Sequence, residues 1–371
     1  MAGAVRVFVP FAKNNMFKIK HYKSIFYLSL FIIFLAGIFL LDDSSFFIYN
    51  KNKEFEANIK VEIGNSTNYF LGGGGTNPIT GVVCENYNRR PIAVMMANDP
   101  VARPLSGISS VDLIIEMPVV SGSITRILAF FVCGNPTEIG ALRSARHDFI
   151  PLAMGFDAIF VHWGGSHFAL DKLDKGVIDN INALYNPFGA FYRKSGLPAP
   201  HNGFTSFDRL DTTSRKLSYR SESKFDGYLF AGYDKCEVCR NGRLAVDYPV
   251  PYDVYYDYNA VKNSYSRFRN GYPEIDKLNN AQVEAKNIVI MRAASRPIDD
   301  QYNDVDVEGG GRAMVYKNGI EISGNWKKDK ENTASKLYFF DDNGAEVKFT
   351  PGKIIIEIVE PYQKISWSMG K

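Results

Sequence analysis

The sequence predicts a membrane-anchoring segment, then an α/β region and then an all-β region, and three observations support this. Within residues 78–235, short apolar runs alternate with stretches of helical spacing, which is typical of a layered, mostly parallel or mixed sheet with functional loops at one edge. Within residues 248–361, short runs rich in aromatic and β-branched residues flank turn sequences, which predicts a series of hairpins. Residues 24–41 form an uncharged apolar run of nearly bilayer length.

The composition excludes some classes of function. The net charge is only +3, and no long basic run occurs outside the N-terminus, so we expect no nucleic-acid partner. Aromatic residues make up 14% of the chain, which favours a β-rich architecture.

The N-terminus predicts a single-pass protein of the cell membrane. Residues 1–23 are basic and Asp42 and Asp43 follow the apolar run, so the N-terminus is expected in the cytoplasm and the rest outside it. A cleaved signal peptide is the alternative interpretation of residues 24–41, and Met16 is an alternative start. Residues 42–77, which include four consecutive glycines, are expected to form a flexible stalk.

Strands and helices follow in the α/β region. Its predicted strands are residues 91–97, 111–117, 125–133 and 158–163. Its predicted helices are a segment directly after Ser144, residues 166–175 and residues 206–217. Residues 236–247 connect the two regions and contain Cys236 and Cys239, a spacing compatible with a local disulfide, idle thiols, a redox pair or half of a zinc site.

Hairpins are the main expectation for the all-β region. Asn318-Gly319 lies between two apolar runs and is the strongest short-range hairpin signal in the chain. Two further hairpins are expected across residues 254–269 and 336–349, and residues 354–360 close the series.

Residues 140–146 concentrate the chemistry of the sequence. Ser144 is expected to cap the following helix, whose free N–H groups would attract an anion. Arg143 and Arg146 would add forked donors suited to phosphate or carboxylate. The alternative is that both arginines pair with nearby carboxylates such as Asp112 or Glu116 and only hold loops together.

Further polar residues are expected at the same sheet edge. The loop 162–167 contains two glycines, which allow a ligand to approach backbone N–H groups. Because arginines reach this edge from separate segments, we predict an anion-binding pocket. Its expected ligand-binding residues are Arg103, Arg126, Arg143, Ser144, Arg146, His162, Gly164, Gly165, Ser166, Arg193, His201 and Asn202.

Catalysis is a competing hypothesis. Asp112 or Asp99 beside arginines could hold a divalent cation or act as a base in phosphoryl chemistry. Ser144 or Ser166 could act as nucleophile with His201 as base, although neither lies in a nucleophile-elbow sequence. No metal site is predicted, because His162 and His167 match no zinc spacing, and no cofactor is expected outside the enzyme alternative.

The sequence resembles the YerB family of bacterial envelope proteins. The resemblance rests on RPIAVMMAND, ARPLSGISSVDLIIEMPV, ITRILAFF, IGALRSAR, DAIFVHWGGS and PHN, and on YPVPYDVYYD, YSRFRNG, GGGRAMVYKNG, GNWKKD and TPGKIIIEIVE. It implies a surface protein with an N-terminal and a C-terminal domain of unassigned activity. Most such proteins are lipoproteins with a cysteine directly after the apolar segment; here residues 41–44 are Leu-Asp-Asp-Ser, which favours an uncleaved membrane helix.

Three functional hypotheses remain. The first is binding of an anionic envelope ligand, such as a phosphate-bearing glycan or a lipid-linked sugar. The second is a phosphotransferase or phosphohydrolase acting on a polyprenyl-phosphate or wall-glycopolymer substrate; a faint similarity to the LytR-CpsA-Psr phosphotransferases supports it, although their Arg-Asp-Thr element is absent. The third is an envelope scaffold that recruits a protein partner through the C-terminal domain.

Overall fold

The computed structural model describes residues 74–120, 122–232, 240–299 and 301–369. The predicted basic segment, membrane anchor and nearly all of the stalk, together with Cys236 and Cys239, lie outside these residues. Among the described residues, no helix is both long and apolar enough to cross a membrane.

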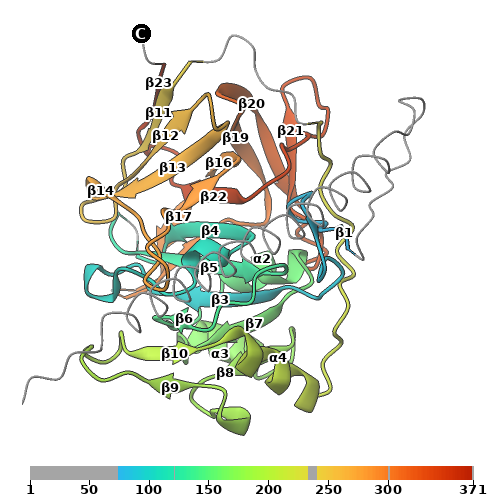
Figure 1. Cartoon of the computed structure of the whole chain (residues 1–371), viewed down its shortest axis with the longest axis vertical. Coiled ribbons are helices and arrows are strands. Elements are labelled where there is room, and N and C mark those ends of the chain that lie inside the picture. Colours follow the sequence, from blue (N-terminus) through green and yellow to red (C-terminus); the bar gives the residue numbers. More distant parts are fainter. Residues whose placement is uncertain (1–73, 121, 233–239, 300, 370–371) are drawn as a thin grey trace, which may run out of the picture. The chain divides into compact units, whose positions relative to one another are not determined.

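Strands dominate the described residues, and the largest sheet has ten of them (Figure 1). In spatial order they are β21 (Tyr338–Asp341), β20 (Ile320–Lys328), β19 (Gly309–Lys317), β16 (Asn287–Arg292), β22 (Ile354–Val359), β4 (Leu113–Pro118), β5 (Thr125–Phe131), β3 (Ile92–Met96), β7 (Ile159–His162) and β8 (Asn180–Asn182). The sheet is mixed, because β22 runs parallel to β4 and to β16, and β7 runs parallel to β3 and to β8.

A second sheet of six strands and three small sheets complete the β-structure. The second sheet consists of β14 (Tyr272–Pro273), β13 (Ser264–Arg269), β12 (Val254–Asn259), β11 (Gly242–Val246) and β23 (Ile365–Met369), with β15 (Glu284–Ala285) beside β13. The small sheets are β6 (Ile139–Gly140), β10 (Gly203–Thr205) and β9 (Tyr192–Arg193); β1 (Gly75–Thr76) and β2 (Val83–Cys84); and β17 (Ser295–Pro297) and β18 (Asn303–Val305).

The expected layered α/β architecture of the N-terminal region is wrong. The described residues contain three α-helices, all short: α2 (Phe149–Gly155), α3 (His167–Leu173) and α4 (Phe207–Lys216). β4 and β5 form an antiparallel pair instead of being joined through a helix, and short 3₁₀ turns (Pro100–Ala102, Ile108–Ser110, Pro187–Gly189) occupy several connections. The C-terminal region is β, as expected, and the Asn318-Gly319 hairpin between β19 and β20 is confirmed.

The helix predicted directly after Ser144 begins later. Residues 141–145 are extended, because Leu142 bridges Met96 and Ala145 bridges Gly165. α2 starts only at Phe149, and Asp148 rather than Ser144 is its N-cap residue. The helical spacing of Phe149, Leu152 and Ala153 was real, but the preceding residues are held by backbone pairing with β3 and with the loop after β7. By contrast, Ser166 caps α3 through its hydroxyl, which accepts from the N–H of Ala169 at 3.2 Å.

The core lies on both faces of the ten-stranded sheet. Side chains alternate along each strand, so Val94 and Met96 face one apolar cluster, whereas Ala93 and Met95 face the other. The first cluster also contains Leu244 of the six-stranded sheet, so the two sheets pack against one another.

Five charged residues are buried between these two sheets and form what we call the buried charge network: Glu116, Arg267, Arg269, Glu274 and Glu357. Glu116 accepts from Arg269 at 3.0 Å and also pairs with Arg267. Arg267 donates to Glu357 at 3.0 Å, and Arg269 pairs with Glu274 at 3.2 Å. Carboxylates therefore neutralise both arginines inside the core.

A disulfide joins Cys84 to Cys133 across 49 residues of sequence. The strand predicted over residues 125–133 ends at Phe131 instead, and Cys133 just beyond it bonds to Cys84 of β2. The bond ties the first described residues to the ten-stranded sheet.

Candidate functional site

Three arginines meet where β3 ends and β5 begins. Arg126 is the second residue of β5, and its Nη1 donates to the carbonyl of Ser144 at 2.7 Å. Arg143 is held by two backbone bonds: its N–H donates to Met95 at 2.9 Å, and its carbonyl accepts from Trp163 at 3.0 Å. The extended segment thus runs between β3 and the loop after β7, which brings the side chains of residues 126, 143 and 146 together.

Asp99 and His201 complete what we call the arginine cluster, which consists of Arg126, Arg143, Arg146, Asp99 and His201. Oδ2 of Asp99 lies 3.6 Å from Nε of Arg143 and 3.6 Å from Nδ1 of His201. Burial lowers the pKa of His201, and Arg143 and Arg126 lower it further against the opposing effect of Asp99. With His201 neutral, three guanidinium groups and one carboxylate leave a net charge of +2.

The three arginines of the cluster repel one another. Arg126 is only 4% exposed, and its burial, followed by the charges of Arg146 and Arg143, lowers its pKa well below the usual value. Burial and Arg143 likewise lower the pKa of Arg146. Because arginine stays protonated at physiological pH, these shifts represent a free-energy cost of keeping the charges together.

Several polar atoms of the cluster are buried without a hydrogen-bond partner. They are Nε of Arg126, Arg143 and Arg146, Nδ1 of His201 and Oδ2 of Asp99. An unsatisfied buried group costs roughly 1–3 kcal/mol, and more when it is charged. An anion placed against the Nε groups of the three arginines would lower that cost.

Aromatic rings border the cluster on two sides. The guanidinium of Arg146 lies 4.9 Å from the ring centre of Tyr302, in the turn between β17 and β18. On the other side, the guanidinium of Arg193 lies 4.3 Å from the ring centre of Trp163 and donates to Asn202 at 2.5 Å. Asn202 directly follows His201 in the chain, and Arg193 of β9 pairs with Gly203 of β10, so Arg193 and Asn202 bond to one another.

Arg103 belongs to the region of the buried charge network. It donates to the carbonyls of Asn98 at 3.0 Å and Pro251 at 3.1 Å, and it lies over the ring of Tyr252. Burial, and next the charge of Arg269, lowers its pKa to about 10. Its donors hold backbone segments together.

In the loop 162–167, which follows β7 and contains two glycines, the polar groups of His162 and Gly164 are hydrogen-bonded within the protein. His162 is fully buried, with Nδ1 2.7 Å from the carbonyl of Gly164 and Nε2 3.2 Å from Oδ1 of Asn180. The N–H of Gly164 donates to Asn182 at 3.1 Å. A side chain at Gly165 would contact Ala145 and Leu170, so this glycine allows close packing of the loop against the extended segment.

Asp112 lies at the opposite end of β5 from Arg126. Its Oδ2 accepts from the N–H groups of Val132 at 2.7 Å and Cys133 at 3.0 Å, and its Oδ1 accepts from Asn77 at 2.9 Å. Across a seven-residue strand, this separates it from the arginine cluster by roughly 20 Å. Burial raises the pKa of Asp112. Its carboxylate thus accepts hydrogen bonds from the backbone N–H groups directly after β5. Of the two catalytic candidates, only Asp99 lies among the arginines.

The alternative that Asp112 or Glu116 pairs with Arg143 and Arg146 is not what the structure contains. Glu116 is engaged by Arg267 and Arg269, and the cluster retains Asp99 alone.

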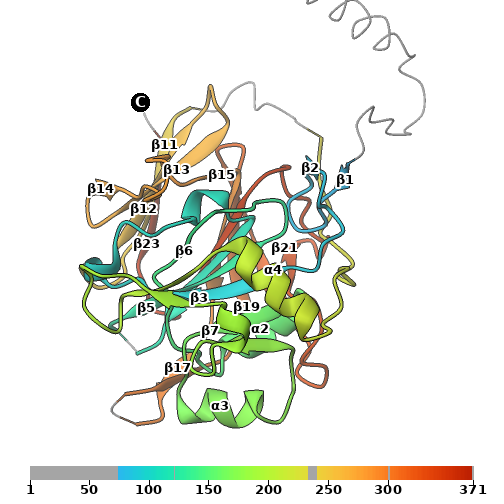
Figure 2. The ribbon, with the colours of Figure 1, turned by 60° about the horizontal axis from the view of Figure 1, so that its bottom comes forward.

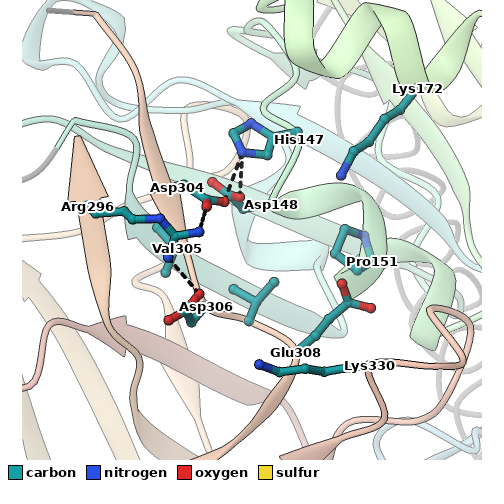
Figure 3. Close-up of a pocket in the computed structure, with 11 residues that line it drawn as sticks. His147, Asp148, Pro151, Lys172, Arg296, Asp304, Val305, Asp306, Glu308 and Lys330 are labelled. Carbon is teal, nitrogen blue, oxygen red and sulfur yellow. Dashed lines mark hydrogen bonds and ion pairs between the residues drawn. The ribbon is translucent and has the colours of Figure 1, made fainter. Parts of the chain in front are cut away.

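A second group of candidate functional side chains, which was not predicted from the sequence, lies near the arginine cluster. His147, Asp148 and Asp304 bring three ligand atoms within 4.8 Å of one another, and a cavity of about 200 Å³ opens beside them (Figure 3). A signal was present, because Asp304, Asp306 and Glu308 alternate with valines and therefore share one side of an extended segment.

Comparisons with known proteins place this chain in a family described as being of unknown function. The family described as "Protein of unknown function (DUF3048) N-terminal domain" matches residues 79–220, and its C-terminal counterpart matches residues 244–356. The Bacillus subtilis (strain 168) protein named "Putative lipoprotein YerB" is 34% identical over 300 residues, which cover 79% of this chain and 89% of that protein. The crystal structure of YerB from Bacillus subtilis superposes with a TM-score of 0.71 at 33% identity, covering 78% of this chain and 99% of that one.

Proposed function

We propose that this chain, which belongs to the YerB-like family with paired DUF3048 domains of unknown function, binds an anionic ligand of the cell envelope at the arginine cluster. The observation that carries the proposal is the excess of buried cationic donors, with three guanidinium groups beside one carboxylate and an Nε on each arginine that makes no hydrogen bond. Such an excess is costly in a ligand-free protein and favourable around a phosphate or carboxylate.

A phosphate-bearing ligand fits this arrangement better than a single carboxylate. A phosphate group offers several acceptor oxygens to donors that arrive from separate directions, and Arg126, Arg143 and Arg146 arrive from a strand and from an extended segment. A phosphorylated glycan or a lipid-linked sugar phosphate is the envelope ligand of this chemistry.

The cellular location is part of the proposal. The relative from Bacillus subtilis is named as a lipoprotein, and residues 24–41 of this chain are apolar and follow a basic segment. No cysteine directly follows that run, so we infer that residues 24–41 themselves anchor the protein and that the described residues lie outside the cytoplasm.

Titration calorimetry tests ligand binding. The full chain in detergent is titrated with pyrophosphate, and Arg143→Ala and Arg146→Ala are each expected to weaken binding about tenfold or more, because each removes a charge-assisted donor. Arg215→Ala is the matched control, since Arg215 is exposed and pairs with Asp211 on α4. Absence of binding to the wild type, or equal loss in all three variants, would overturn the proposal.

A second candidate function is hydrolysis or transfer of a phosphoryl group, and the pairing of Asp99 with His201 is the observation that favours it. Asp99 faces Nδ1 of a histidine whose pKa is lowered, so Nε2 is available to accept a proton. Release of phosphate from a phosphoester by the wild type, lost in His201→Ala while pyrophosphate binding persists, distinguishes an enzyme from a binding protein.

A further inference from the structure

A cavity of about 200 Å³ lies beside the start of α2, and its walls come from segments far apart in sequence. His147 and Asp148 precede α2, Lys172 belongs to α3, and Asp304 lies in β18 (Figure 3). Figure 2 shows β17 and α3 near the same edge of the view, and the Phe168 and Tyr302 rings contact each other with centres 6.1 Å apart.

The ligand atoms in this cavity have the spacing of a metal coordination shell. Nε2 of His147 lies 3.0 Å from Oδ1 of Asp148 and 3.2 Å from Oδ1 of Asp304. Two neighbouring ligands of an octahedral ion with bonds of about 2.1 Å are about 3 Å apart. An imidazole nitrogen carries at most one hydrogen, so Nε2 cannot make a full hydrogen bond to both carboxylates.

A further observation points to a ligand in the same place. Oε1 of Glu308, which lines the same cavity as His147, is buried without a hydrogen-bond partner. This oxygen carries a desolvation cost that the protein atoms around it do not offset. His147 is itself only 8% exposed, so the imidazole that faces the two carboxylates is buried as well.

The neighbouring cations leave room for a metal ion. Arg296 pairs with Asp306 and with Oδ2 of Asp304, so Oδ1 of Asp304 still faces His147. Lys172 and Lys330 are exposed and can extend into solvent. Four carboxylates therefore line the cavity, and only two of them are paired with Arg296.

We propose that His147, Asp148 and Asp304 bind a divalent first-row transition-metal ion such as Mn²⁺, with Glu308 as a further oxygen donor in the cavity. One imidazole with several carboxylates suits Mn²⁺ and Zn²⁺, whereas Ca²⁺ and Mg²⁺ prefer all-oxygen shells. The ion would join β18 to the segment before α2, which lie 157 positions apart in the sequence. This site is separate from the proposed anion site and does not depend on it.

Mn²⁺ binding to the untagged full chain in detergent tests the proposal, after removal of metals with EDTA and dialysis. Mn²⁺ is the probe because thiolates such as those of Cys236 and Cys239 favour softer metals. Electron paramagnetic resonance of free Mn²⁺ is expected to show one saturable site, and both Asp304→Asn and His147→Ala are expected to weaken it tenfold or more.

Asp306→Asn is the matched control, because Asp306 lines the same cavity and pairs with Arg296 but is not among the three ligands. It is expected to change affinity less than about threefold. Near-ultraviolet circular dichroism in EDTA shows whether each variant is folded. If the wild type binds no Mn²⁺ at 1 mM, which is roughly a −4 kcal/mol limit on affinity, or if Asp306→Asn weakens binding as much as Asp304→Asn, the proposal is overturned.

Discussion

The buried charge network and the arginine cluster both place arginines in low-dielectric surroundings, but they differ in how the charge is balanced. In the network, Arg267 and Arg269 face Glu116, Glu274 and Glu357. In the cluster, Asp99 pairs with Arg143 and interacts with Arg126, and it is the one carboxylate among three arginines. The balanced set joins two packed sheets, whereas the unbalanced set is the basis of our proposal that an anion binds from outside.

The register of the ten-stranded sheet explains why the network needs both arginines. Glu116 of β4 and Glu357 of β22 are direct neighbours in adjacent parallel strands, and both are fully buried. Arg267 and Arg269 are two positions apart on β13, so they face the same side of that strand and reach both carboxylates. Without them, two like charges would lie side by side in the core.

Glu116→Ala is expected to have the largest effect on stability, because it removes the one carboxylate that pairs with both buried arginines, Arg267 and Arg269. The expected loss in the free energy of unfolding is about 3–5 kcal/mol, measured by urea denaturation of the full chain. Glu284→Ala, which removes a more exposed carboxylate paired with Lys262, is the control and is expected to cost under about 1 kcal/mol. Equal effects of the two variants would show that the network does not hold the sheets together.

Glu357→Gln is expected to change how stability depends on pH. Burial, and next the charge of Glu116, raises the pKa of Glu357 from 4.5 to about 7. Between these values the folded protein holds a proton that the unfolded chain releases, so this group's contribution to stability falls as pH rises from about 4.5 to about 7.

Urea denaturation across that pH range measures the effect. Glu357→Gln is expected to remove a slope of up to about 1.4 kcal/mol per pH unit. The exposed variant Glu331→Gln serves as the control and is expected to retain the wild-type profile. A profile of Glu357→Gln identical to that of the wild type would show that Glu357 titrates at an ordinary pH.

Arg143→Lys should have a smaller effect, on ligand affinity rather than on stability. Lysine keeps the positive charge but loses the planar fork, so pyrophosphate affinity is expected to fall only a few-fold, less than in Arg143→Ala. Calorimetry of the full chain compares the two variants. If lysine and alanine weaken binding equally, geometry rather than charge dominates recognition.

Local sequence patterns predicted the strands better than the way they assemble. The Asn318-Gly319 turn was readable because both residues adopt positive φ there, 50° and 71°. The position of β22 in the sheet could not be predicted from the sequence. Its apolar run can pair with any buried strand, and its partner β4 lies more than 200 residues earlier. The helix after Ser144 was misplaced because backbone pairing with β3 overrides the helical spacing of nearby residues.

The same limit applies to the candidate site. Sequence patterns placed Arg126, Arg143, Arg146, His201 and Asp99 in loops expected at one sheet edge, although β6 and β10 belong to a separate small sheet. It could not separate Arg103, which lies by the buried charge network, or reveal Tyr302 and Asp304, which arrive from the C-terminal region. Single carboxylates in apolar strands, Glu116 in β4 and Glu357 in β22, were a readable sign that cationic partners exist elsewhere in the chain. The scaffold hypothesis stays a prediction.

The most direct measurement of the central claim is the thermal stability of Arg126→Met, compared with the wild type, with and without pyrophosphate. Methionine keeps an apolar stem while removing a buried charge that repels Arg143 and Arg146, so the variant is expected to be at least as stable as the wild type without ligand. Pyrophosphate is expected to raise the melting temperature of the wild type but not that of Arg126→Met. Marked destabilisation of Arg126→Met, together with no effect of pyrophosphate on the wild type, would show that the arginine cluster is structural and would contradict the account.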